Sequence, residues 1–192
     1  EIVGPDILEK VPRFKALLED HKGGMFDGHT ICACPFHTND HGERLLSLVD
    51  HTMIPHILRR LLDESEFLSG HGIRSVSRIH AEQRELGTLP GVGTALIEYD
   101  PGESSTTLFG GNSNWRGPVW MPINYSILQA LTKFHRYLGP NFKVHAPSIS
   151  DRELNLREIV NAISDRLINL FRRDEKGRMP VFPEHSPFQQ DP

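Results

Sequence analysis

The sequence has few cysteines and no cluster of basic residues. Its 192 residues include two cysteines, Cys32 and Cys34, and a disulfide between them would close a tiny, strained loop. We therefore favour a reducing compartment, the cytoplasm. Lys and Arg number 21 and Asp and Glu 25, for a net charge of −4. Without a Lys/Arg block the chain has no electrostatic surface for nucleic acid or an anionic membrane, so neither is expected as a partner.

Long hydrophobic runs are also absent. No apolar stretch approaches the roughly 18 residues that a membrane helix needs, and residues 1–10 do not resemble a signal peptide. Tryptophan is scarce, and the only two, Trp115 and Trp120, lie five positions apart. This clustering in an aromatic-poor chain directs attention to the segment around them.

The periodicity of the apolar residues predicts helices joined by long, Gly-rich loops. We expect helices over 5–18, with a kink at Pro12, and over 52–67 and 122–138. A last helix is expected after Asn155, with Glu158 completing a capping box. Its predicted buried face consists of Leu156, Ile159, Val160, Ile163, Leu167, Leu170 and Phe171. Residues 69–114 look irregular, with a possible short hairpin near 95–99. The length is that of about one domain, and we find no internal linker in 1–192.

The stretch 109–125, FGGNSNWRGPVWMPINY, has the chemistry of a sugar site. Indole rings cover the apolar C–H face of a sugar, while amides and a guanidinium bind its hydroxyl groups. The glycines and prolines shape the backbone before the ligand arrives. The alternative is that both tryptophans only fill the junction between loop and helix. Composition does not decide between these two hypotheses.

A second cluster, 67–78, leaves a helix through a Gly-His-Gly turn and contains Arg74 and Arg78. Arg74 is a candidate for binding a ligand or orienting a carboxylate. The competing interpretation is a structural bond from its guanidinium to backbone carbonyls.

Two further groups are weaker candidates. One group contains residue types that bind zinc, namely His29, Cys32, Cys34 and His37. Their spacing is not that of a zinc ribbon or finger. The alternative interpretation is a solvated loop. Glu98, Asp100 and Glu103 are close enough to form an acid–base pair, with Glu103 the weak catalytic candidate, although adjacent surface carboxylates give the same pattern. No nucleophile elbow or phosphate-binding loop is present, and no cofactor is expected.

The tryptophan stretch closely resembles glycoside hydrolase family 63 and its mannosylglycerate-hydrolase-like relatives, in which G-G-N-S-N-W-R-G-P-x-W-x-P-x-N-Y lies on the sugar-binding side. Upstream, 66–80 (EFLSGHGIRSVSRIH) and 99–104 (YDPGES) resemble neighbouring elements of that family, as do 155–170 and 188–192. The sequence departs from the family pattern at Ser105 and Thr107, and residues 32–41 have no counterpart.

This resemblance implies a mainly α fold in which 1–192 is a single partial domain, part of an (α/α)₆ toroid. It also implies inverting hydrolysis of an α-glucoside or related oligosaccharide. It implies substrate-binding roles for Arg74, Asn112, Asn114, Trp115, Arg116, Trp120, Asn124 and Tyr125. It also implies that the general acid and base lie in the rest of the parent chain, so we expect the isolated chain to be inactive. The alternative is a non-catalytic carbohydrate-binding or pseudoenzyme fragment.

Overall fold

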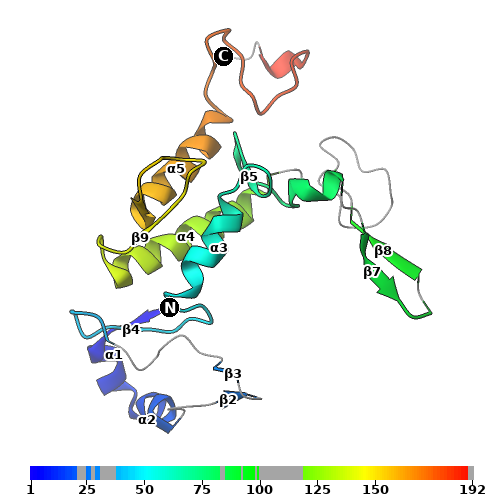
Figure 1. Ribbon diagram of the computed structural model, residues 1–192. Coiled ribbons are helices and arrows are strands. Elements are labelled where there is room, and N and C mark those ends of the chain that lie inside the picture. Colours follow the sequence, from blue (N-terminus) through cyan, green and yellow to red (C-terminus); the bar gives the residue numbers. More distant parts are fainter. Residues whose placement is uncertain are drawn as a thin grey trace.

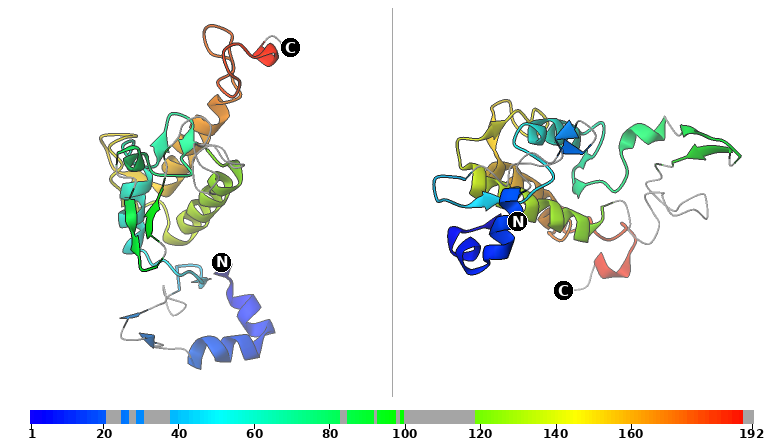
Figure 2. Two further views of the ribbon diagram at one scale, coloured as in Figure 1. Left: turned by 90° about the vertical axis from the view of Figure 1, so that its right-hand side faces the viewer. Right: turned by 90° about the horizontal axis from the view of Figure 1, so that it is seen from below.

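The computed structural model of the protein describes residues 1–20, 25–26, 29–30, 38–82, 85–91, 93–97, 99 and 119–189. Its centre is formed by three helices, α3 (Met53–Leu61), α4 (Met121–Leu138) and α5 (Leu156–Asn169). They gather around one hydrophobic core, and the amino-terminal helices lie away from it (Figure 1; Figure 2). The candidate functional site is built on this three-helix centre.

The core is centred on α5. Leu156, Ile159 and Ile163 of this helix are completely shielded from solvent. The helix packs against α4 and against two small hairpins. The buried residues that form this cluster are Ile54, Leu58, Leu62, Leu68, Ile73, Leu131, Val144, Ala146, Leu154, Leu156, Ile159, Val160, Ile163 and Leu167. Burial of such side chains stabilises a fold by about 1.5–3 kcal/mol each.

All described strands form two-stranded antiparallel sheets. The pairs are β1 (Ile2–Val3) with β4 (Arg44–Leu45), β2 (Met25–Phe26) with β3 (His29–Thr30), β5 (Leu68–Ser69) with β6 (Gly72–Ile73), β7 (Glu85–Leu89) with β8 (Gly93–Leu96), and β9 (Lys143–Val144) with β10 (Leu154–Asn155). The β5–β6 and β9–β10 hairpins supply core residues. The β7–β8 hairpin extends away from the three-helix centre (Figure 1).

The predicted toroid is wrong. The described ranges contain five α-helices and five strand pairs, and only α3, α4 and α5 share a core. Apolar periodicity identified where helices form, but it carries no information on how they are arranged. Several segments interpreted as loops instead close into hairpins of two residues per strand, which are too short to show an alternating pattern.

The amino-terminal segment contains two helices where one kinked helix was predicted. They are α1 (Pro5–Lys10) and α2 (Pro12–Asp20), and the break is at Val11. Proline disfavours helical geometry in the residue before it, so the break precedes Pro12 as expected. The predicted apolar face is largely exposed, however, and in α1 only Leu8 is buried.

The capping box predicted for the last helix is confirmed. The amide of Glu158 donates to the Asn155 side chain at 3.0 Å, and the Glu158 carboxylate accepts from the Asn155 amide at 2.8 Å. Arg152 also binds Glu158, and this hydrogen bond, followed by that from Asn155, holds the pKa of the Glu158 carboxyl below its usual value. Phe171, predicted on the buried face, is exposed because α5 ends at Asn169.

Two short 3₁₀ helices complete the described chain, η1 (Arg78–Ala81) and η2 (Pro187–Gln189). Among the described residues, no helix combines the length and hydrophobicity required to cross a lipid bilayer.

Asn155→Ala will remove the side-chain acceptor of the α5 cap. We expect a loss of about 1 kcal/mol in the free energy of unfolding, measured by urea denaturation. The matched control is Asn155→Ser, which keeps a capping oxygen and is expected to retain most of the stability. Equal stability of the alanine variant and the unmodified chain would contradict the assigned role of this cap.

Candidate functional site

The start of α4 meets the β5–β6 hairpin. These elements belong to the two sequence stretches with the strongest site chemistry, 109–125 and 66–80. Leu68 and Ile73 of the hairpin lie in the hydrophobic core, which fixes the hairpin against the helices. The start of α4 and the hairpin, which are far apart in the sequence, therefore lie side by side.

The Asn124 side chain connects α4 to the β5–β6 hairpin. Its side chain is 1% exposed, and its amide forms two bonds with the backbone of one residue, Ile73. The Ile73 N–H donates to Asn124 Oδ1 at 2.8 Å, and Asn124 Nδ2 donates to the Ile73 carbonyl at 2.9 Å. Nδ2 also donates to the Trp120 carbonyl at 3.1 Å. A carboxamide offers one acceptor and two donors, so all three bonds suit Asn.

Gly72 allows this close approach. Its φ of +116° lies in a region that residues with a side chain rarely adopt. A Cβ atom there would lie 2.6 Å from Leu167 Cδ2 and 3.0 Å from Asn124 Oδ1. Glycine is therefore required both by the backbone conformation and by the contact with α4 and α5.

Arg74 binds backbone carbonyls. Its Nη1 atom donates to the carbonyls of Glu64 and Glu66, at 3.1 and 3.2 Å, and to that of Leu68. These bonds close the turn between α3 and the hairpin. The guanidinium thus has the structural role that was predicted as the alternative to ligand binding, and it also borders a cavity.

That cavity lies between α3, the hairpin and the start of α4. It has a volume of about 300 Å³ and is lined by Leu61, Phe67, Ile73, Arg74, Ser75, Trp120, Ile123, Asn124 and Ile127. Trp120 is half-buried at the amino-terminal end of α4. The lining combines two aromatic rings with a guanidinium and a hydroxyl group. We call it the Trp120 cavity.

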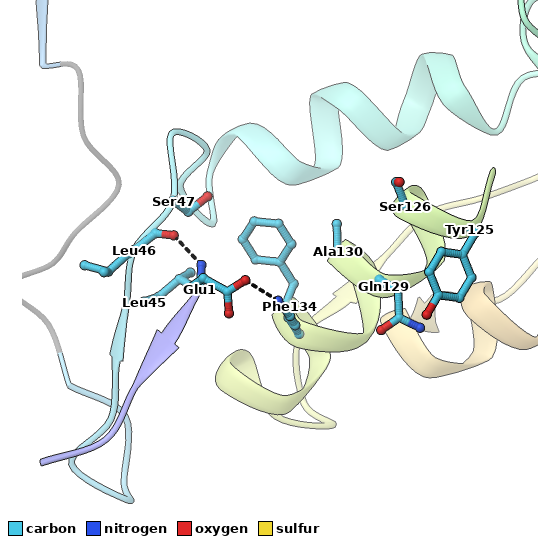
Figure 3. A pocket seen from close by; sticks show the side chains of 10 residues that line it. Glu1, Leu45, Leu46, Ser47, Tyr125, Ser126, Gln129, Ala130 and Phe134 are labelled. Atoms are coloured by element: carbon cyan, nitrogen blue, oxygen red, sulfur yellow. Dashed lines mark hydrogen bonds and ion pairs between the residues drawn. The ribbon is translucent and has the colours of Figure 1, made fainter. Parts of the chain in front are cut away.

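Tyr125 faces a different cavity, of about 360 Å³, between α4 and the segment around β4. Its side chain is 63% exposed. Figure 3 shows Tyr125 and Gln129 on one side and Glu1 and Leu46 on the other. Lys133 Nζ lies 2.5 Å from the Glu1 carboxylate. This hydrogen bond and the positive charge of Lys133 lower the pKa of the Glu1 carboxyl. The structure therefore separates Tyr125 from the Trp120 cavity.

Most other predicted site residues lie outside the described ranges. These are Glu103, Asn112, Asn114, Trp115, Arg116, Cys32, Cys34 and His37. Of the metal candidates, only His29 falls in a described element, β3. Within the described part of the chain, no three His, Cys, Asp or Glu residues are grouped so that they could hold a metal ion.

Sequence reasoning missed Phe67 as part of the site. It belongs to the stretch 66–80 that was singled out, but its apolar side chain was assigned to the end of a helix. The helix ends earlier, at Leu61, and Phe67 lines the Trp120 cavity. Its place three residues before the Gly-His-Gly turn is the signal that could have identified it.

Comparison with known proteins finds a relative that is much longer than this chain. An uncharacterized protein of Saccharomyces cerevisiae, YMR196W, is 46% identical over 149 residues, which are 77% of this chain. The matched part is 14% of the length of the yeast protein. No protein-family model matches the chain, and no solved structure matches it.

Gly72→Ala will destabilise the chain by about 2 kcal/mol or more, because a Cβ atom is strained at this φ and contacts Leu167. Gly70→Ala in the same hairpin is the control, since nothing lies within 4 Å of the added atom. Chemical denaturation of both variants measures the difference. Similar stabilities would show that the hairpin does not pack as described.

Asn124→Ala will leave the Ile73 N–H and carbonyl without their partner, at a cost of about 2–4 kcal/mol. Asn124→Asp restores the acceptor but turns a carboxylate oxygen toward the Ile73 and Trp120 carbonyls. This repulsion raises the pKa of the new carboxyl, so the variant is expected to recover relative to the unmodified chain as the pH falls. A fully stable aspartate variant at pH 7 would contradict the hydrogen-bond assignment.

Proposed function

We propose that this chain supplies the carbohydrate-binding edge of a larger, inverting α-glycoside hydrolase. The observation that carries the proposal is that Arg74 and Trp120 line the same cavity. Each belongs to a stretch that resembles glycoside hydrolase family 63, and the two stretches are separated in sequence. Their meeting at one cavity supports a shared role in binding.

The chemistry of the lining suits a sugar. The rings of Phe67 and Trp120 offer apolar surfaces for the C–H face of a pyranose, and Arg74 and Ser75 add polar groups at the edge. The carbonyl bonds of Arg74 and the amide bonds of Asn124 fix the walls before a ligand arrives. Such preorganisation lowers the entropic cost of binding.

Catalysis is assigned to other parts of the parent protein. An inverting glycosidase needs two carboxyl groups about 6.5–9.5 Å apart, one to protonate the leaving oxygen and one to activate water. None of the described residues that line the Trp120 cavity is an Asp or Glu. The greater length of the yeast relative supports a multi-part protein in which such groups come from elsewhere.

The same lack of carboxylates in the described lining favours a second candidate, a non-catalytic carbohydrate-binding fragment. The two candidates share the sugar-binding cavity and differ in whether the parent protein hydrolyses its ligand. Assay of the full-length parent on α-glucosides separates them.

Titration of the 192-residue chain with maltose and methyl α-glucoside, followed by tryptophan fluorescence, tests the binding. Both tryptophans of the chain lie in the motif, so the emission reports on this segment alone. We expect a saturable change in the unmodified chain and an affinity about tenfold lower in Trp120→Leu, because the ring supplies the stacking surface. Trp115 remains as the reporter in that variant.

Tyr125→Leu is the matched control, since this exposed ring lies in the other cavity, and its affinity is expected to stay unchanged. The isolated chain is expected to bind without hydrolysing the sugars. If a folded Trp120→Leu variant binds these sugars as tightly as the unmodified chain, Trp120 only fills the junction between loop and helix, and the proposal is overturned.

A further inference from the structure

A separate cavity of about 430 Å³ lies on the other flank of α3, where the loop 145–148 packs beside the helix. Its floor is apolar and buried, formed by Leu58, Leu62 and Ala146. The volume is within the range of small-molecule sites. Polar side chains from both elements surround this floor.

The loop is firmly held. The amides of Ile149 and Ser150 both donate to the Ala146 carbonyl, at 2.9 and 3.0 Å. From the opposite side, Arg166 of α5 donates to the Ser148 carbonyl at 3.3 Å. His145 lies between two buried residues, Val144 and Ala146, so its backbone position is fixed while its side chain is exposed.

Three basic side chains line this cavity. His56 and Arg59 are three positions apart on α3 and therefore share one side of the helix, and His145 comes from the loop. Among the residues that the structure describes, none of these three side chains has a hydrogen-bond or ion-pair partner. Neighbouring Arg60, in contrast, binds Glu66 through Nε at 3.1 Å.

Asp63 at the end of α3 is the one acidic residue among the described lining. Its Oδ1 atom accepts from the Ser65 hydroxyl at 2.6 Å and from the Ser65 amide at 2.7 Å. These bonds keep the pKa of the Asp63 carboxyl below its ordinary value, so it is ionised at neutral pH. An ionised carboxylate accepts hydrogen bonds, as from a ligand hydroxyl group.

We propose that this cavity binds a small hydroxylated phosphate monoester. The phosphate group lies against Arg59, His56 and His145, and a hydroxyl group of the ligand donates to Asp63. The carbon chain covers Leu58, Leu62 and Ala146. This site is separate from the Trp120 cavity, and the proposal does not depend on the function proposed there.

A phosphate fits the donor set better than a carboxylate does. Three donor side chains from two elements line the cavity. A phosphate monoester presents three terminal oxygens to them, whereas a carboxylate presents two. A guanidinium binds phosphate through paired N–H groups, and such charge-assisted bonds are stronger beside an apolar surface than in bulk water.

Isothermal titration of the 192-residue chain with inorganic phosphate and glycerol 1-phosphate tests the site, with glycerol as the uncharged comparison. We expect saturable binding of both phosphates, tighter for the ester, and none of glycerol. Arg59→Ala is expected to weaken binding about tenfold or more, and His145→Gln several-fold. Shifts of the His56 and His145 ring resonances in NMR spectra, assigned with glutamine variants, locate the ligand.

Arg60→Ala is the matched control, because it removes a guanidinium from the next position of the same helix but outside the lining. Its phosphate affinity is expected to stay within about twofold of the unmodified chain. Arg59 is exposed, so a thermal melt is expected to show its variant folded. The absence of saturable binding, an equal loss in both arginine variants, or shifts spread over all histidines would overturn the proposal.

Discussion

The pairing of the Asn124 side chain with the backbone of Ile73 is the constraint on which the site depends. One carboxamide ties the first turn of α4 to the β5–β6 hairpin through two bonds and to the Trp120 carbonyl through a third. Because the amide is buried, its loss would leave polar groups unpaired and shielded from solvent. The hairpin can approach so closely only because residue 72 is glycine.

This constraint determines where the tryptophan segment meets the core. With Trp120 held through its carbonyl and Arg74 held by three carbonyls, the walls of the Trp120 cavity are fixed by bonds within the protein. The residues that line this cavity therefore include two kinds. Asn124 and Arg74 hold the walls through hydrogen bonds, while the rings of Trp120 and Phe67 form apolar surface in the cavity.

Local features of the fold could be predicted from the sequence, and long-range ones could not. The break before Pro12 and the capping box of Asn155 and Glu158 follow from residues within four positions of one another. The arrangement of the helices depends on contacts between distant segments, and the toroid expected from the family resemblance was wrong. The role of Asn124 depends on Ile73, 51 positions away, so no local pattern could distinguish a buried amide from a ligand-binding one.

The exchange rate of the Ile73 amide proton tests the central claim most directly. In the structure its acceptor is a side chain, Asn124 Oδ1, within a buried contact. Hydrogen exchange measured by NMR should therefore show this amide protected to the same degree as the amides in the middle of α5, exchanging only through global unfolding. Exchange as fast as that of an exposed loop amide would show that the Asn124 pairing does not hold the hairpin to α4.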